Sequence, residues 1–357
     1  MKTTPLFSPG YRQARAHFLA AARACTAQVH TYTHPLIGAQ GEALAMDIAV
    51  HGPADAAKVL MTTSAVHGIE GFCGSALQSG LLRSLSLPPG VSVVHVHAVN
   101  PHGFSHARRV NEDNIDLNRN FIDFNQPLPV NADYAEVHPL LLPAQWPPTP
   151  TQQAALDALA ERWGPRRLQR AITSGQYQFA QGLWFGGFSP SWSQRTFRQV
   201  LQQRLGHAQH IAWIDLHTGL GPHGHGERIF ACTDNGAALQ RARHWWGPDI
   251  TSVETGTSQS VPLSGPIQMA IYEACPRAEY TGICLEFGTL PLPQMIAAMR
   301  ADHWLALHPE APAALQRSIR ADMRQAFNPP SAAWQAQVWA QGLQAAEQAL
   351  TGLAHTA

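Results

Sequence analysis

The chain runs from Val59 through Leu-Met-Thr-Thr-Ser-Ala-Val66 into His67-Gly-Ile-Glu70, so an apolar segment ends in a histidine and a glutamate. An apolar run of this length is typical of a buried strand. Three further runs end beside polar residues: 91–99 before Asn100, 211–216 before His217, and 283–285 before Glu286. In open α/β sheets the ligand crevice lies outside the carboxyl ends of the strands. We therefore predict an α/β fold in which four strand ends converge on one site.

Three of these residues form a possible metal-ligand set. A histidine-x-x-glutamate pair alone carries little weight in a chain with 19 histidines and 24 acidic residues. Here, however, His67 and Glu70 directly follow one strand and His217 ends another. Two imidazoles and one carboxylate hold zinc in catalytic sites and leave a fourth position open for water. The sequence therefore predicts a catalytic Zn²⁺ site.

The segment after the fourth strand is rich in arginine and asparagine. It reads Arg108-Arg109-Val-Asn-Glu-Asp-Asn-Ile-Asp116-Leu-Asn118-Arg119-Asn120-Phe121. Such a stretch is commonly a solvated loop, but here it follows a strand end in a chain that already offers zinc ligands. A guanidinium fork binds a carboxylate through two hydrogen bonds. We expect Asn118 and Arg119 to bind a substrate carboxylate.

Taken in order, five motifs resemble those of the zinc carboxypeptidase (M14) clan. They are His67-x-x-Glu70, Asn100-Pro-x-Gly103, Asp116-Leu-Asn118-Arg119-Asn120-Phe121, Asp215-Leu-His217 and Glu286-Phe-Gly-Thr289. Within the clan the chain is most similar to a bacterial branch of M14-like proteins, DUF2817. Ser174-Gly-Gln-Tyr177, Trp184-Phe-Gly-Gly187 and Pro190-Ser-Trp192 also resemble that branch. The resemblance implies a mixed twisted sheet flanked by helices, of the zinc carboxypeptidase-like (phosphorylase/hydrolase-like) class.

The resemblance also implies catalytic roles. Glu286 matches the general base, which would take a proton from zinc-activated water and pass it to the leaving nitrogen. Arg109 matches best the arginine that stabilises the oxyanion, and the adjacent Arg108 is the alternative. The implied function is zinc-dependent cleavage of an amide bond next to a free carboxylate, in a peptide or an N-acyl amino acid.

Two other functions stay open at this stage. The tyrosine that closes over substrate in the clan has no match around 262–266, and only Tyr272 and Tyr280 lie near. Its absence favours an N-acyl-amino-acid deacylase of the aspartoacylase/succinylglutamate desuccinylase type as the alternative. A non-catalytic binding protein on a peptidase scaffold is the alternative from another class. The resemblance places the wall of the substrate pocket near Ile271.

Composition limits the partners. A chain of 357 residues with 45% hydrophobic content can fill one large core, so we expect a single domain over residues 1–357. Lys plus Arg and Asp plus Glu number 24 each, so no net charge attracts nucleic acid or an anionic membrane. The first ten residues lack an apolar signal core, no run reaches membrane-spanning length, and the five cysteines form no C-x-x-C pair. We expect a cytoplasmic protein without nucleic-acid or membrane partners.

Other features predict structure rather than chemistry. We expect Asp215 on the strand face opposite His217, Cys73 and Cys284 in the core, and His223 and His225 in solvent. The match to G-x-G-x-x-G at 219–224 includes Pro222, where a dinucleotide-binding helix would have to begin. Seven prolines between residues 122 and 150 favour an irregular surface excursion near the site mouth. Helices are expected over about 9–25, 71–85 and 330–353, and strands over 29–32 and 44–50.

Overall fold

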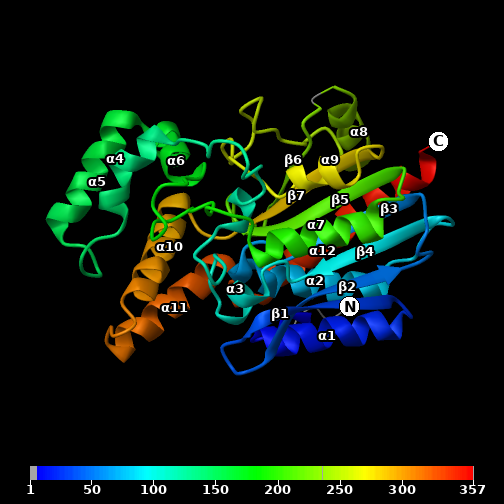
Figure 1. Ribbon diagram of the computed structural model, residues 1–357, viewed down its shortest axis with the longest axis horizontal. Coiled ribbons are helices and arrows are strands. Elements are labelled where there is room, and N and C mark those ends of the chain that lie inside the picture. The colour runs from blue at the N-terminus through cyan, green and yellow to red at the C-terminus, as the bar shows by residue number, and fades with distance from the viewer. Residues whose placement is uncertain (1–5, 235, 357) are drawn as a thin grey trace.

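The computed structural model describes residues 6–234 and 236–356. Within them, seven strands form one sheet in the order β1-β2-β4-β3-β5-β7-β6 (Figure 1). The strands are β1 Gln28–Ile37, β2 Ala43–His51, β3 Lys58–Thr63, β4 Val91–His97, β5 His210–Gly219, β6 Gly226–Phe230 and β7 Glu279–Gly288. Antiparallel β1 and β2 extend one edge of the sheet, and antiparallel β6 forms the other. The predicted mixed α/β sheet is confirmed.

The four strands predicted to carry the site are adjacent in the sheet. In the order β4-β3-β5-β7, each pairs in parallel with the next. Every residue of β4 is buried, and β3 and β5 are exposed only at their first residues. Strands covered on both faces read as continuous apolar runs, which is why these segments stood out in the sequence. Their carboxyl ends share one edge of the sheet.

Helices cover both faces of the sheet (Figure 1). On one face α2 Gly71–Ser84, α8 Ala237–Trp246 and α12 Ala332–His355 pack on residues such as Leu60 and Ile214. On the other face α7 Trp192–Leu205 and α9 Met269–Ala274 pack on Met61 and Trp213. The predicted helix near residues 9–25 begins slightly later, as α1 Tyr11–Ala24. None of the helices in the described part of the chain is long and apolar enough to cross a membrane.

A second group of helices lies beyond the site edge of the sheet (Figure 1). It comprises α4 Ala132–Leu141, α5 Pro150–Trp163, α6 Pro165–Thr173, α10 Leu292–Leu307 and α11 Ala313–Phe327. The prediction of irregular structure throughout 122–150 is therefore wrong for α4. Asn131 caps this helix by accepting from the Tyr134 N–H, and Pro139 stands only in its last turn. Burial of Tyr134, Val137 and Leu141 offsets the donor that the proline lacks.

Candidate metal centre and active site

The predicted metal ligands meet at the shared edge of the central strands. His67 follows β3, and Glu70 ends the short 3-10 turn Gly68–Glu70 that leads into α2. His217 and Glu286 are register partners on the parallel strands β5 and β7, so their side chains emerge side by side. The sheet thus brings together residues that are far apart in the sequence.

His67, Glu70 and His217 form a compact buried cluster. The Nδ1 atoms of the two histidines each lie 2.8 Å from one oxygen of the Glu70 carboxylate. All three donor atoms lie within 4.8 Å of one another. Burial opposes ionisation of Glu70, but the two imidazoles outweigh it and lower the pKa of this carboxyl group. This donor set fits a divalent metal ion.

Two further carboxylates, those of Asp116 and Asp215, orient the two histidines. Oδ1 of Asp116 lies 3.1 Å from Nε2 of His67, and Oδ2 of Asp215 lies 2.7 Å from Nε2 of His217. Metal-binding histidines almost always donate their second ring N–H to such a partner, which fixes the tautomer and the ring direction. Each Nδ1 is thereby left to face the centre of the cluster, as a ligand must.

The prediction for Asp215 is wrong. Side chains alternate along a strand, so residues two apart share a face, and Asp215 lies on the same face as His217. The hydroxyl of Thr63, on the neighbouring strand, also donates to the Asp215 carboxylate. Asp215 therefore links β3 to the imidazole of His217.

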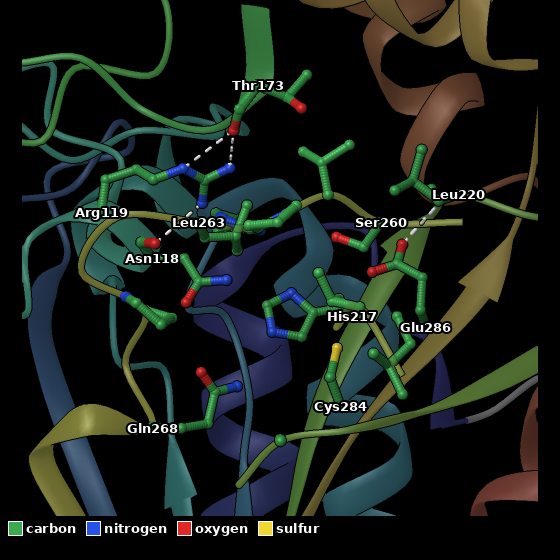
Figure 2. A pocket seen from close by; sticks show the side chains of 18 of the residues that line it. Asn118, Arg119, Thr173, His217, Leu220, Ser260, Leu263, Gln268, Cys284 and Glu286 are labelled. Atoms are coloured by element: carbon green, nitrogen blue, oxygen red, sulfur yellow. Dashed lines mark hydrogen bonds between the residues drawn. The ribbon is translucent and has the colours of Figure 1, made fainter. Parts of the chain in front are cut away.

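Glu286 lies beside this cluster, as predicted for the base. Its Oε1 accepts a hydrogen bond from the backbone N–H of Leu220 at 3.0 Å (Figure 2). Burial and the nearby Glu70 carboxylate raise the pKa of Glu286 to about 8. A carboxyl group with a raised pKa, held beside possible metal ligands, is suited to proton transfer near neutral pH.

The structure distinguishes the two neighbouring arginines. Arg109 donates from Nε to Asp116 at 3.0 Å and from Nη1 to Glu70 at 3.3 Å, and its Nη2 lies 2.8 Å from Nε2 of His67. Arg108 instead pairs with Asp302 at 3.3 Å. Arg109, and not Arg108, lines the large cavity in front of the cluster.

Asn118 and Arg119 lie on another wall of the same cavity (Figure 2). Nε and Nη2 of Arg119 donate to the Thr173 carbonyl at 3.2 and 2.5 Å, and Nη1 donates to the Asn118 carbonyl at 2.9 Å. Three of its five N–H groups are therefore engaged within the described residues, which leaves two for a ligand. A Cβ at Gly175 would lie 2.8 Å from Cδ of Arg119, so the Ser174-Gly-Gln-Tyr177 motif needs this glycine.

The cavity has a volume of about 320 Å³. Its Arg119 side is closed by α6 and residues 258–264, which we call the clasp. Nη2 of Arg166 donates to the Ser260 carbonyl at 2.7 Å, and Nε2 of Gln169 donates to the Gln259 carbonyl at 2.9 Å. The Ser264 N–H donates to the Ser174 carbonyl at 2.9 Å. Hydrogen bonds thus connect α6 and Ser174 with residues 258–264, which lie about ninety residues further along the chain.

Several expectations about the cavity wall need correction. Ile271 is buried in the core, whereas Gln268, Met269 and Tyr272, on the other side of the same short helix, line the cavity. The wall thus lies near Ile271, as expected, although Ile271 itself does not line the cavity. Cys284 also lines the cavity instead of lying within the core, because it shares a strand face with Glu286.

The expectations for Cys73 and for the two loop histidines agree with the structure. Cys73 is buried, and His223 and His225 are exposed. Of the two candidate tyrosines, Tyr272 lines the cavity, whereas the buried Tyr280 donates its hydroxyl to the Ala231 carbonyl at 3.0 Å. Trp184, from the Trp184-Phe-Gly-Gly187 motif, also lines the cavity. Among the cavity residues that no motif indicated are Met295, Met299 and Phe327, which come from α10 and α11.

Comparison with known families identifies the chain. The family model described as "Protein of unknown function (DUF2817)" matches residues 7–341. The chain belongs to this family. No protein among those with curated descriptions matches it.

Solved structures resemble this DUF2817 protein in fold. Thrombin-activatable fibrinolysis inhibitor (TAFI) aligns at a TM-score of 0.50 and 12% identity over 98% of this chain and 75% of its own. Carboxypeptidase A from Helicoverpa armigera gives 0.43 and 13%, covering 89% and 74%. A succinylglutamate desuccinylase from Silicibacter sp. TM1040 gives 0.40 and 13%, covering 79% and 66%. The fold resemblance predicted from the motifs is confirmed.

Proposed function

We propose that the protein is a zinc-dependent hydrolase that cleaves an amide bond next to a free carboxylate. The observation that carries this proposal is the position of Glu286, a buried carboxyl group with a pKa raised to about 8, beside the cluster of His67, Glu70 and His217. A general base next to a three-ligand metal site is the minimum equipment for metal-assisted hydrolysis.

His67, Glu70 and His217 would hold the zinc ion. Two imidazole nitrogens and one carboxylate, with the second ring nitrogens bound to Asp116 and Asp215, match the donor chemistry that zinc prefers. When bound, zinc supplies a Lewis acid for the scissile carbonyl and lowers the pKa of a water molecule.

The chain's own groups would carry the proton and the developing charge. Glu286 takes the proton from the attacking water and delivers it to the leaving nitrogen, a role worth roughly 10²–10⁴ in rate. Arg109 lines the cavity beside the metal ligands, where its guanidinium can donate to the carbonyl oxygen as negative charge develops.

Arg119 and Asn118 would bind the carboxylate of the substrate. Arg119 is buried and keeps two N–H groups for a ligand. The clasp borders the cavity on this side, so a polypeptide that continued past the carboxylate would have to pass the joined segments. This arrangement supports removal of one terminal residue or deacylation of one amino acid, and it argues against cleavage within a chain.

The test compares a substrate acid with its matched primary amide. Wild-type enzyme should favour the acid by orders of magnitude in kcat/KM, because an amide cannot accept the charge-assisted pair of hydrogen bonds that the Arg119 guanidinium offers a carboxylate. This holds even though Oδ1 of Asp116 lies 3.7 Å from Nη1 of Arg119. Arg119→Lys should weaken the acid substrate, because an ammonium group lacks the planar fork, and Arg119→Ala should weaken it further. Activity on the amide should stay the same in both variants. Equal kcat/KM for acid and amide in wild type would rule out the carboxylate role and favour a general amidase.

A further inference from the structure

The cavity has two chemically different ends. Arg119 and Glu286 stand on opposite sides of it, with His217 between them (Figure 2). A substrate whose carboxylate meets Arg119 therefore extends past the metal ligands towards Glu286 and what lies behind it. That far end receives the acyl portion of the substrate, which is the part that supplies the scissile carbonyl.

The wall behind Glu286 is apolar. An ideal Cβ on Gly219 would lie 3.4 Å from Oε1 of Glu286, 2.6 Å from the methyl group of Met295 and 3.3 Å from the ring of Phe327. Met295 and Phe327 belong to one hydrophobic cluster with Trp184 and Met299, and all four line the cavity. We call these four residues the acyl wall.

The backbone holds one member of this wall in an unusual conformation. Trp184 has a φ of 52°, in the left-handed region that bulky residues rarely adopt. Its carbonyl accepts from the Gln176 N–H at 3.1 Å, which ties it to the loop that also contacts Arg119. Strain of this kind concentrates at ligand sites, where the surrounding structure maintains it.

On the side that faces the main cavity, the wall offers no cation to a carboxylate, although Trp184 and Met299 also border a small neighbouring pocket with Arg108 and Asp302. None of its four side chains is ionisable, and the only guanidinium or ammonium groups among the described residues that line the cavity are Arg109 and Arg119. Arg109 already contacts Glu70 and Asp116. Arg119 lies at the opposite end of the cavity, where we propose that it binds the carboxylate of the substrate. An acyl group that carries a carboxylate would be buried here without a counter-ion and beside the carboxyl group of Glu286, which is strongly unfavourable.

From this we infer that the enzyme selects substrates whose acyl portion is apolar and carries no carboxylate. This inference rests on the proposed function and narrows it. It favours amino acids blocked with an alkanoyl or aromatic acyl group. It disfavours succinyl derivatives and other acyl groups that end in a carboxylate. Each buried methylene should improve kcat/KM about fourfold until the wall is filled.

The test uses N-acetyl-, N-butyryl-, N-hexanoyl- and N-succinyl-leucine. The butyryl and succinyl groups have the same chain length and differ in a terminal methyl versus a carboxylate. We expect kcat/KM to rise from acetyl to hexanoyl by more than tenfold and to favour butyryl over succinyl by more than tenfold. A preference for succinyl, or no dependence on chain length, would overturn the inference.

Binding to the Glu286→Gln variant, measured by calorimetry, separates the two proposals. If butyryl-leucine binds more tightly than succinyl-leucine but wild type cleaves neither, the acyl wall stands and the proposed function fails. If wild type cleaves all four without preference, the function stands and the wall fails. Equal binding of butyryl- and succinyl-leucine also overturns the wall.

A variant pair locates the preference. Met299→Phe should fill part of the space beside the acyl wall. It should lower the ratio of kcat/KM for hexanoyl-leucine to kcat/KM for acetyl-leucine by at least tenfold. Leu307→Phe introduces the same side chain at an exposed residue of α10 outside the cavity, and should leave that ratio unchanged. Leu292→Phe on α10 provides a second filling variant at a half-buried position. An unchanged ratio in folded Met299→Phe and Leu292→Phe would contradict the assignment.

Discussion

Asp215 places its Oδ2 2.7 Å from Nε2 of His217, and the opposite nitrogen of the same ring faces Glu70. The carboxylate therefore determines which nitrogen is available as a ligand. Asp116 lies in the same position beside His67, where Nη2 of Arg109 also approaches Nε2 at 2.8 Å. Both outer carboxylates are fully buried, so solvent does not weaken either contact.

Metal affinity should depend on Asp215 as well as on the ligands. Purified wild type should carry about one zinc per chain, and His217→Ala should remove most of it. Asp215→Asn should weaken zinc binding by about 10–100-fold, because the amide holds the ring less firmly in the ligand tautomer. Competition with a chelator, read by metal analysis, measures both effects. His223→Ala is the control, since His223 is exposed and should leave zinc content unchanged. Full occupancy in His217→Ala would remove this residue from the ligand set.

Glu286→Gln should separate metal binding from chemistry. The amide preserves the shape and can still accept from the Leu220 N–H, but it cannot take up a proton. Zinc content should therefore stay at the wild-type level while kcat falls by at least about a hundredfold. Turnover close to wild type would show that another group is the base. Loss of zinc would instead make Glu286 a ligand.

The two adjacent arginines should behave differently. Arg109→Ala should lower kcat by about 10²–10³ with little change in KM, since the oxyanion exists only in the transition state. Arg108→Ala breaks an ion pair with Asp302 outside the main cavity, so its effect should appear in thermal stability and not in kcat. Steady-state kinetics and melting curves of both variants test this. The reverse pattern would assign the oxyanion to Arg108.

Two buried histidines should make the fold sensitive to acid. Burial lowers the pKa of His95 to about 3 and of His97 to about 4. The unfolded chain binds these protons near pH 6.5, so unfolding takes up protons below that pH. Stability should be full above pH 6.5 and fall by up to about 1.4 kcal/mol per pH unit for each histidine, until the folded-state pKa is reached. Urea unfolding of a His95→Gln/His97→Gln variant should show a flatter pH dependence, whereas exposed His207→Gln should not.

The sequence predicted the part of the site that rests on strand ends. Apolar runs and short motifs placed His67, Glu70, His217 and Glu286 correctly, because the four parallel strands are adjacent and their polar residues follow directly. The pocket wall was predicted near Ile271, and the neighbouring Gln268, Met269 and Tyr272 do line the cavity. Ile271 itself is buried in the core, which the sequence could not indicate because no pattern there shows the helix phase. Asp215 was predicted on the face of β5 opposite His217. That error was avoidable, because side chains two residues apart on a strand lie on the same face.

Tertiary packing determined the rest. Met295, Met299 and Phe327 reach the cavity from helices far along the chain, and no motif marks them. The Thr173 carbonyl that holds Arg119 is a backbone group at the end of α6, so residue identity gives no sign of it. Helix α4 forms despite its proline because three of its side chains become buried.

The clasp gives the molecule two regions of different stiffness. The candidate metal ligands stand on adjacent strands in the middle of the sheet, and moving them would disrupt its packed core. The clasp consists of a few hydrogen bonds, and those from Arg166 are exposed to solvent, where each contributes only about 0.5–1.5 kcal/mol. Local opening is easiest in regions with few buried contacts. We therefore expect the clasp to open more readily than the strand ends that carry the candidate metal ligands.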